Sequence, residues 1–279
     1  MIDTQVQAAG LNWHVRQDGD GPDLVCIHGA GASLESWDAL VPLLEAEFRL
    51  TRMDLPGHAD TEAFRPGLYS LRRTAQAVAE LCRTLELESP LVLGHSAGGA
   101  IGLKWSLDGH APMPGRILAI NPALLPFSGV AGLMFPAMAR FAAMLPLLDG
   151  MIARRAERTT EVQRLLEGTG SQLQGPDVAR YQALMARRSH VRAVIEMMAG
   201  WRLDGLIEEW HQTDGSLSVI LGGRDRAVPP RKTAAALRDV ADVALIEDVG
   251  HLAHEERPHL VADWLRTQTG LNDEQCSYG

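Results

Sequence analysis

The chain has 279 residues, of which 46% are hydrophobic and 22% charged, as in globular proteins that bury a core of their own. Its net charge of −9 argues against a general nucleic-acid binder, because such a protein needs a basic face to displace counterions from phosphates. The three cysteines are widely spaced and the first ten residues lack a signal-peptide pattern, so we expect reduced thiols in a cytoplasmic protein.

The first 121 residues alternate between short apolar runs and helical patterns. Polar and apolar residues alternate from Thr4 to Val15 around Gly10, which predicts an antiparallel hairpin. Apolar runs predict buried strands over residues 23–28, 48–54, 90–94 and 116–121. Apolar residues at helical spacing predict helices over residues 36–47 and 71–87, and residues 97–107 are also expected to be helical. Strands that alternate with helices indicate a mostly parallel, doubly wound α/β sheet.

The alternation stops after Asn121 and resumes at residue 217. The pattern is completed by a strand over residues 217–221, a helix near 233–240, a strand over 243–246 and a helix from His254. We therefore predict a sheet of about eight strands that is interrupted by an inserted helical cap. Residues 1–121 and 211–279 would form the α/β core, and residues 122–210 the cap.

The predicted cap differs from its flanks in composition. It holds ten arginines against nine acidic residues and seven of the ten methionines. Methionine suits a broad apolar ligand and arginine suits carboxylates, although methionines that pack helices and arginines that face water explain the same pattern. The uncharged stretch over residues 117–139 contains three prolines, which argues against a membrane-spanning helix and leaves contact with a membrane surface open.

The strongest chemical signal is the segment GHSAG at residues 94–98, which matches G-x-S-x-G. It directly follows a predicted strand and opens a predicted helix, which is the context that the motif requires. In such a turn the serine occupies a strained conformation, with its hydroxyl projecting from the sheet edge and a helix N-terminus behind it. Ser96 is therefore the candidate nucleophile.

A serine hydroxyl needs a base to remove its proton, and an acid and then a histidine follow the serine along the chain in proteins with this motif. Asp225 follows the strand that ends at Leu221, and His251 follows the strand that ends near Ile246. We predict His251 as general base and acid and Asp225 as its orienting carboxylate. Asp248 competes for the carboxylate role, and His254 for the base, although a surface or capping role suits His254 better. His211 is expected to be exposed.

An oxyanion hole requires two backbone donors. One is the amide of Ala97, directly after the candidate nucleophile, and the other is expected in the loop after His28, at Ala30. Gly29 and Gly31 would let that loop approach a substrate closely. His28 itself leads into the turn and is predicted to be a structural hydrogen-bonding residue.

These segments resemble the α/β-hydrolase superfamily over nearly the whole chain, in CIHGAGAS (26–33), DLPGH (54–58) and GHSAGG (94–99). Ala59 departs from the pattern, since many members have glycine there. INPALLPFSG (120–129) resembles, more narrowly, the magnesium-chelatase accessory hydrolases of bacteriochlorophyll biosynthesis. That resemblance implies a role near magnesium insertion into protoporphyrin IX, with chelatase subunits as candidate partners. It implies no known reaction, and metal insertion is not a hydrolysis.

Three functions remain open at this point. The chain is a serine hydrolase of the magnesium-porphyrin branch, a carboxylesterase or carbon–carbon bond hydrolase of unrelated role, or a porphyrin-binding chaperone with a vestigial triad. An intact triad argues against the last, because a pure binder has no need of a strained serine. The ligand is expected to be a small apolar molecule, with a porphyrin as the candidate. We expect no cofactor and no metal, because no phosphate loop or ligand cluster is visible.

Overall fold

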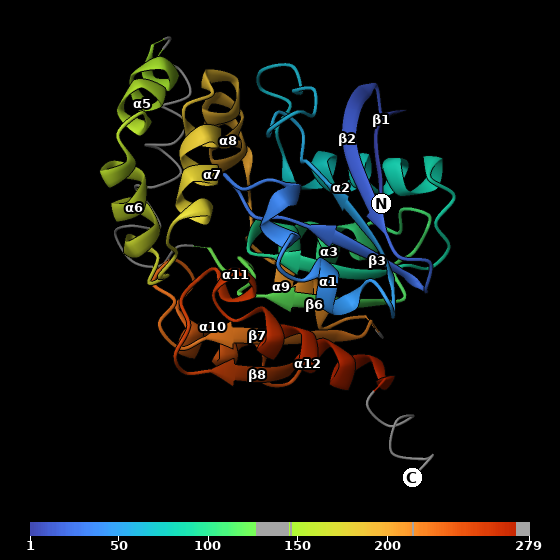
Figure 1. Cartoon of the computed structure of the whole chain (residues 1–279). Helices are drawn as coiled ribbons and strands as arrows, with labels where there is room; N and C mark the ends of the chain where they lie inside the picture. The colour runs from blue at the N-terminus through green and yellow to red at the C-terminus, as the bar shows by residue number, and fades with distance from the viewer. Residues whose placement is uncertain (127–144, 146, 214, 272–279) are drawn as a thin grey trace.

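The computed structural model describes residues 1–126, 145, 147–213 and 215–271. One eight-stranded sheet runs through it (Figure 1). In spatial order its strands are β1 (Ile2–Ala8), β2 (Leu11–Asp18), β4 (Arg49–Met53), β3 (Asp23–Ile27), β5 (Leu91–His95), β6 (Arg116–Ile120), β7 (Leu217–Gly222) and β8 (Asp242–Ile246). β2 pairs antiparallel with β1 and β4, and all strands from β4 to β8 pair in parallel. The predicted fold class is confirmed.

The hairpin at the N-terminus has the predicted turn. Ala9 and Gly10 both have positive φ, at 54° and 74°, as the two central residues of a tight hairpin turn require. β1 and β2 are in register from Ile2 opposite Gln17 to Ala8 opposite Leu11. This hairpin extends the parallel part of the sheet beyond β4.

Successive side chains of the central strands point to opposite faces of the sheet, and each face has its own apolar cluster. Val25 and Ile27 of β3 belong to the cluster on one face, whereas Leu24 and Cys26 belong to the cluster on the other. The first face is covered by α2 (Leu71–Thr84) and α3 (Ala97–Leu107), and the second by α12 (Pro258–Thr269). Covering on both faces explains why these strands read as continuous apolar runs.

Two predicted helices are each divided in two. The helix expected over residues 36–47 is a 3₁₀ turn, η1 (Leu34–Trp37), followed by α1 (Val41–Leu44), which starts around Pro42. Likewise, the last predicted helix consists of α11 (Ala253–Glu256) and α12, which begins at Pro258. Proline has no amide hydrogen and its ring clashes with a preceding helical turn, so each proline begins a new helix.

The chain between β6 and β7, which we call the insertion, carries helices in its described residues. These are α5 (Leu148–Ala156), α6 (Thr159–Gly168), α7 (Pro176–Met185), α8 (Arg188–Gly200) and α9 (Leu206–Trp210), and α10 (Pro230–Leu237) follows β7. Figure 1 shows α5 to α8 gathered at one side of the molecule, whereas Leu206 and Trp210 of α9 join the core cluster under α2 and α3. The exact division between a core and a cap of residues 122–210 stays a prediction. Among the described residues, no helix is long and apolar enough to cross a membrane.

Candidate active site

Ser96 stands between β5 and α3 in a strained backbone conformation, with φ 50° and ψ −111°. Positive φ is costly for a residue with a side chain, so the surrounding packing must impose it. Glycines make that packing close: a Cβ added to Gly98 would lie 1.9 Å from the carbonyl oxygen of Ile27. A Cβ added to Gly94 would lie 2.5 Å from the carbonyl carbon of Gly98. The turn therefore requires small residues on both sides of the serine.

Asp225 and His251 are joined by a hydrogen bond. His251 Nδ1 donates to Asp225 Oδ2 over 2.7 Å, and the carboxylate side chain is fully buried. The other carboxylate oxygen accepts from the backbone amides of Ala227 at 2.7 Å and Val228 at 2.8 Å. These bonds fix the carboxylate in one orientation, and the carboxylate in turn fixes the orientation of the His251 ring.

Ser96 lies close to this pair through its neighbour His95. The His95 and His251 rings are 4.7 Å apart between centroids, and His95 Nε2 donates to the carbonyl oxygen of His251 at 2.9 Å. Within the described residues, no hydrogen bond joins the Ser96 hydroxyl to His251. Catalytic hydrogen bonds are often long in ligand-free proteins and shorten when substrate binds. The roles of Ser96, Asp225 and His251 therefore stay a prediction.

Asn121 fixes the same backbone from the sheet, a contribution that the sequence analysis missed. Its side-chain amide donates to the carbonyl oxygens of Gly250 at 3.0 Å and His251 at 2.8 Å. The side-chain oxygen Oδ1 of Asn121 accepts from the backbone amide of Gly222 at 2.7 Å. Asn121 is fully buried with φ 44°. A polar residue directly after a buried strand was the available signal, but it was interpreted only as the border of the cap.

The other acidic and histidine residues considered near the site are not placed like Asp225 and His251. Asp248 is exposed and pairs with Arg224 at 2.8 Å, so it does not hold the His251 ring. His211 is exposed, as expected. The surface or capping role expected for His254 is wrong: the residue is fully buried, with its ring 4.6 Å from Trp37 and 4.5 Å from His95. Burial lowers the pKa of His254 to about 3, so its ring is neutral at physiological pH.

The two predicted oxyanion donors have free amides. Within the described part of the chain, neither Ala30 nor Ala97 donates a backbone hydrogen bond to another residue. Ala97 opens α3, where the first amides of a helix lack internal partners. Both amides therefore remain able to bind an oxyanion, although this role too is untested.

The loop that carries Ala30 is fixed at three points. His28 Nε2 accepts from the amide of Leu55 at 2.9 Å, which agrees with the structural role predicted for His28. The carbonyl oxygen of Gly31, where φ is +83°, accepts from His190 Nε2 of α8 at 3.2 Å. The amide of Leu34 donates to Asp54 Oδ1 at 2.8 Å.

His190 also accepts from the amide of Ala59 at 3.1 Å, so both ring nitrogens are used and the neutral ring has one tautomer. Ala59 itself has φ 41°, in the left-handed region that favours glycine. Burial lowers the pKa of His190 to about 4, which keeps this double contact intact at neutral pH.

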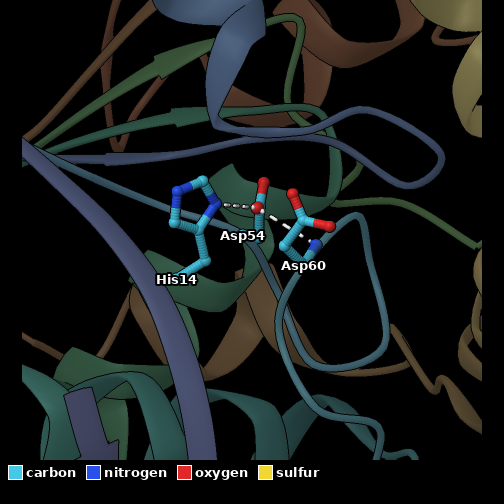
Figure 2. Close-up of side chains that lie close together, drawn as sticks. All are labelled: His14, Asp54 and Asp60. Atoms are coloured by element: carbon cyan, nitrogen blue, oxygen red, sulfur yellow. Dashed lines mark hydrogen bonds and ion pairs between the residues drawn. The ribbon is translucent and has the colours of Figure 1, made fainter. Parts of the chain in front are cut away.

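Asp54 belongs to a cluster with His14 and Asp60, which Figure 2 shows. Asp54 Oδ2 accepts from His14 Nδ1 at 2.7 Å and from the backbone amide of Asp60 at 3.4 Å. His14 Nε2 donates to Asp3 Oδ1 at 2.9 Å. Each ring nitrogen of His14 is engaged in a hydrogen bond with a carboxylate, so these residues fit a hydrogen-bonded anchor rather than a metal site.

The cap side chains singled out in the sequence are mostly engaged within the protein. The carboxylates of Glu161, Asp60, Asp149 and Glu196 pair respectively with Arg155, Arg187, Arg188 and Arg192, whereas Arg154 and Arg158 are exposed. Met197 is fully buried in the main core and Met185 packs on the insertion's own cluster. Met134, Met138 and Met144 lie outside the described residues. The described contacts favour packing and ion pairing for most of these side chains.

Comparison with known proteins decides the family. The model of the alpha/beta hydrolase family matches residues 24–264. The chain belongs to this family. The Magnesium-chelatase 30 kDa subunit of Rhodobacter capsulatus is 37% identical over 262 residues, which cover 91% of each chain. The narrower resemblance noted in the sequence is thereby confirmed.

Other members of the family are more distant. A pimeloyl-[acyl-carrier protein] methyl ester esterase of Methylococcus capsulatus is 28% identical over 264 residues, covering 87% of this chain and 94% of its own. Among solved structures, an epoxide hydrolase superposes with a TM-score of 0.80 at 20% identity, over 95% of this chain and 97% of its own. An esterase from Thermogutta terrifontis gives 0.75 at 20% identity, over 96% and 98%. These two structures share the fold.

The His14 anchor predicts a pH dependence of stability. Its hydrogen bond with Asp54, aided by the one with Asp3, raises the pKa of His14 above 6.5 against the opposing effect of burial. The stabilisation from this proton is therefore complete below the unfolded-state pKa and is lost as the pH rises through the folded-state value. The difference in the free energy of unfolding between wild type and His14→Gln should therefore shrink as the pH rises above about 6.5 and passes the folded-state pKa, measured by urea denaturation. A difference that grows with pH would contradict this account.

Proposed function

We propose that this chain is a serine hydrolase in which Ser96 is the nucleophile, His251 the general base and acid, and Asp225 the carboxylate that orients His251. The observation that carries the proposal is the buried bond between Asp225 and His251. It lies after the carboxyl ends of β7 and β8, in contact with the residue that precedes the strained Ser96. Ligands bind at this edge in open α/β sheets.

Each residue then has a defined chemical task. His251 Nε2 takes the proton of the Ser96 hydroxyl as its oxygen attacks a carbonyl carbon, and later gives the proton to the leaving group. Asp225 stabilises the imidazolium that forms in between. The amides of Ala30 and Ala97 stabilise the negative oxygen of the tetrahedral intermediate. Water then hydrolyses the acyl-serine by the same route, with His251 again as base.

We further propose that this hydrolase is an accessory factor of magnesium chelatase in bacteriochlorophyll biosynthesis. The support is the 37% identity to the Magnesium-chelatase 30 kDa subunit over nearly the full length of both chains. Chelatase subunits are then the protein partners, and the substrate is an ester or a related bond in an apolar molecule, with a porphyrin as the candidate ligand. The 28% identical methyl ester esterase favours a second candidate, an ordinary carboxylesterase.

Labelling with a fluorophosphonate tests the nucleophile. This reagent reacts with activated serines, so it should modify Ser96 in the wild type, and mass spectrometry of the digested protein locates the label. Ser96→Ala should abolish the modification, and His251→Ala should slow it on the order of a thousandfold or more because the base is gone. Ser106→Ala and His211→Ala are the matched controls, since neither residue belongs to the proposed site, and both should label at the wild-type rate. A label on Ser33 or Ser106 with Ser96 unmodified would refute the triad.

Deletion in a bacteriochlorophyll-producing cell tests the pathway. Loss of this protein should lower the flux to magnesium porphyrins, so that protoporphyrin accumulates, and pigment extraction with absorption spectroscopy measures both. Complementation with Ser96→Ala then separates two roles. No rescue supports hydrolysis, whereas full rescue shows that binding alone suffices and favours a porphyrin-binding chaperone. Normal pigment in the deletion strain would contradict the pathway role and leave the ordinary esterase.

A further inference from the structure

The loop over residues 169–172 joins α6 to α7 in the insertion, more than 50 residues before Asp225 in the chain. It nevertheless contacts the two segments that carry the proposed acid and base. Gly170, Ser171 and Gln172 of this loop line a cavity of about 510 Å³ together with Glu167 and residues 223–226. Nothing in the sequence analysis assigned this loop a role.

Its first contact is with the segment of Asp225. The carbonyl oxygen of Thr169 accepts from the backbone amide of Arg226 at 2.9 Å. Arg226 lies between Asp225 and the two amides, of Ala227 and Val228, that bind the Asp225 carboxylate. The insertion therefore holds the turn that sets the orientation of this carboxylate.

Its second contact is with the segment of His251. Ser171 is 1% exposed, and its hydroxyl oxygen accepts from the amide of Leu252, the residue directly after His251, at 2.9 Å. A hydrogen bond of 3.1 Å to Thr169 Oγ1 fixes the hydroxyl. The amide of Gln172 donates to Glu256 Oε2 at 3.2 Å, and the other oxygen of that carboxylate accepts from the amide of Gly250 at 3.0 Å. The loop thus binds on both sides of His251.

Two glycines let the three segments approach this closely. A Cβ added to Gly170, where φ is +88°, would lie 1.9 Å from the carbonyl oxygen of Arg224. A Cβ added to Gly250 would lie 2.3 Å from the carbonyl carbon of Gly170. Backbone therefore packs directly on backbone, and neither position has room for a side chain.

Apolar packing and a buried carboxylate join the same parts. One apolar cluster joins Leu166 and Val178 of the insertion to Leu252 and to Ala32, which lies in the loop that carries Ala30. Tyr181 donates its hydroxyl to Glu255 Oε1 of α11 at 2.7 Å. The contacts of the loop are thus part of a continuous buried interface between the insertion and both catalytic segments.

From these contacts we infer that the 169–172 loop is a positioning element of the catalytic machinery, with Ser171 as a positioning residue for His251. The inference rests on the proposed function. Ser171 touches no reacting atom; it holds the backbone next to His251, while Thr169 holds the backbone next to Asp225. The geometry of the Asp225–His251 pair then depends on the position of the insertion relative to the sheet. A ligand that shifts the insertion therefore changes the rate of catalysis.

Two variants of the loop test this inference, each with a matched control. Ser171→Ala removes the acceptor of the buried Leu252 amide, and Gly170→Ala forces a Cβ against Arg224. Ser70→Ala removes a serine oxygen that accepts from the amide of Arg73 at 3.2 Å, far along the chain from the proposed site. Gly168→Ala adds a methyl group two residues from Gly170, where nothing lies within 4 Å.

The readouts separate positioning from simple destabilisation. The rate of fluorophosphonate labelling of folded protein should fall on the order of tenfold or more in Ser171→Ala and Gly170→Ala and stay within about twofold in both controls. The downfield proton resonance of His251 Nδ1–H should shift or broaden in the two loop variants only. Circular dichroism and thermal melting confirm that the variants are folded.

Hydrogen exchange on the wild type keeps the test decisive if neither loop variant folds. The Leu252 amide should be strongly protected, and exchange as fast as that of an exposed amide would overturn the inference. So would loop variants that fold and keep both the wild-type labelling rate and the wild-type resonance. Failure of the wild type to label at Ser96 would instead refute the proposed serine chemistry, and the resonance and the exchange rate would still decide the positioning role.

Discussion

The carbonyl oxygen of His251 is the point on which the proposed site depends. It accepts one hydrogen bond from His95 Nε2 and one from the side chain of Asn121, and both donors are buried. A carbonyl held by two donors fixes the peptide that carries the imidazole, and Asp225 then has only to set the ring. His95 ends β5 and Asn121 directly follows β6, its parallel neighbour, so the sheet itself determines where the proposed base stands. Such convergent buried contacts would hold the imidazole in one position, as general base catalysis requires.

The buried histidines His95, His190 and His254 carry no positive charge near the proposed base, His251. Burial lowers the pKa values of His95, His190 and His254, and mutual repulsion among the rings adds to this for His95 and His254. None of these three rings therefore brings a positive charge next to the imidazolium that His251 would form. His14 has the opposite environment, since hydrogen bonds with the carboxylates of Asp54 and Asp3 raise its pKa. The buried rings of His95 and His190 thus act as neutral hydrogen-bonding groups, whereas the ring of His254 contributes packing against Trp37 and His95.

Local signals were sufficient for most of the fold. The central strands could be predicted from their apolar runs, and α3 from its position directly after the Ser96 turn. In both cases the signal lies within the segment itself. The sequence misled where one proline outweighs a hydrophobic period, as at Pro42, and where burial depends on a partner far along the chain, as for His254 beneath Trp37. Ser96, Asp225 and His251 could be named because each follows a strand. Asn121 and Ser171 could not, since their contacts span 130 and 81 residues and no local pattern records them.

The close approach of Gly170 to Gly250 also limits how the insertion of this protein can be replaced. Insertions of this kind are commonly regarded as modules that can be exchanged while the α/β core stays the same. In this protein the backbone of the insertion packs directly on the backbone of the α/β core, with Gly170 on one side and Gly250 on the other. A foreign cap with any larger residue at the junction would displace the histidine segment of the recipient. Replacement of the insertion in this protein therefore requires paired changes on both sides of the junction, so new specificities should arise more readily from substitutions within the insertion than from its exchange.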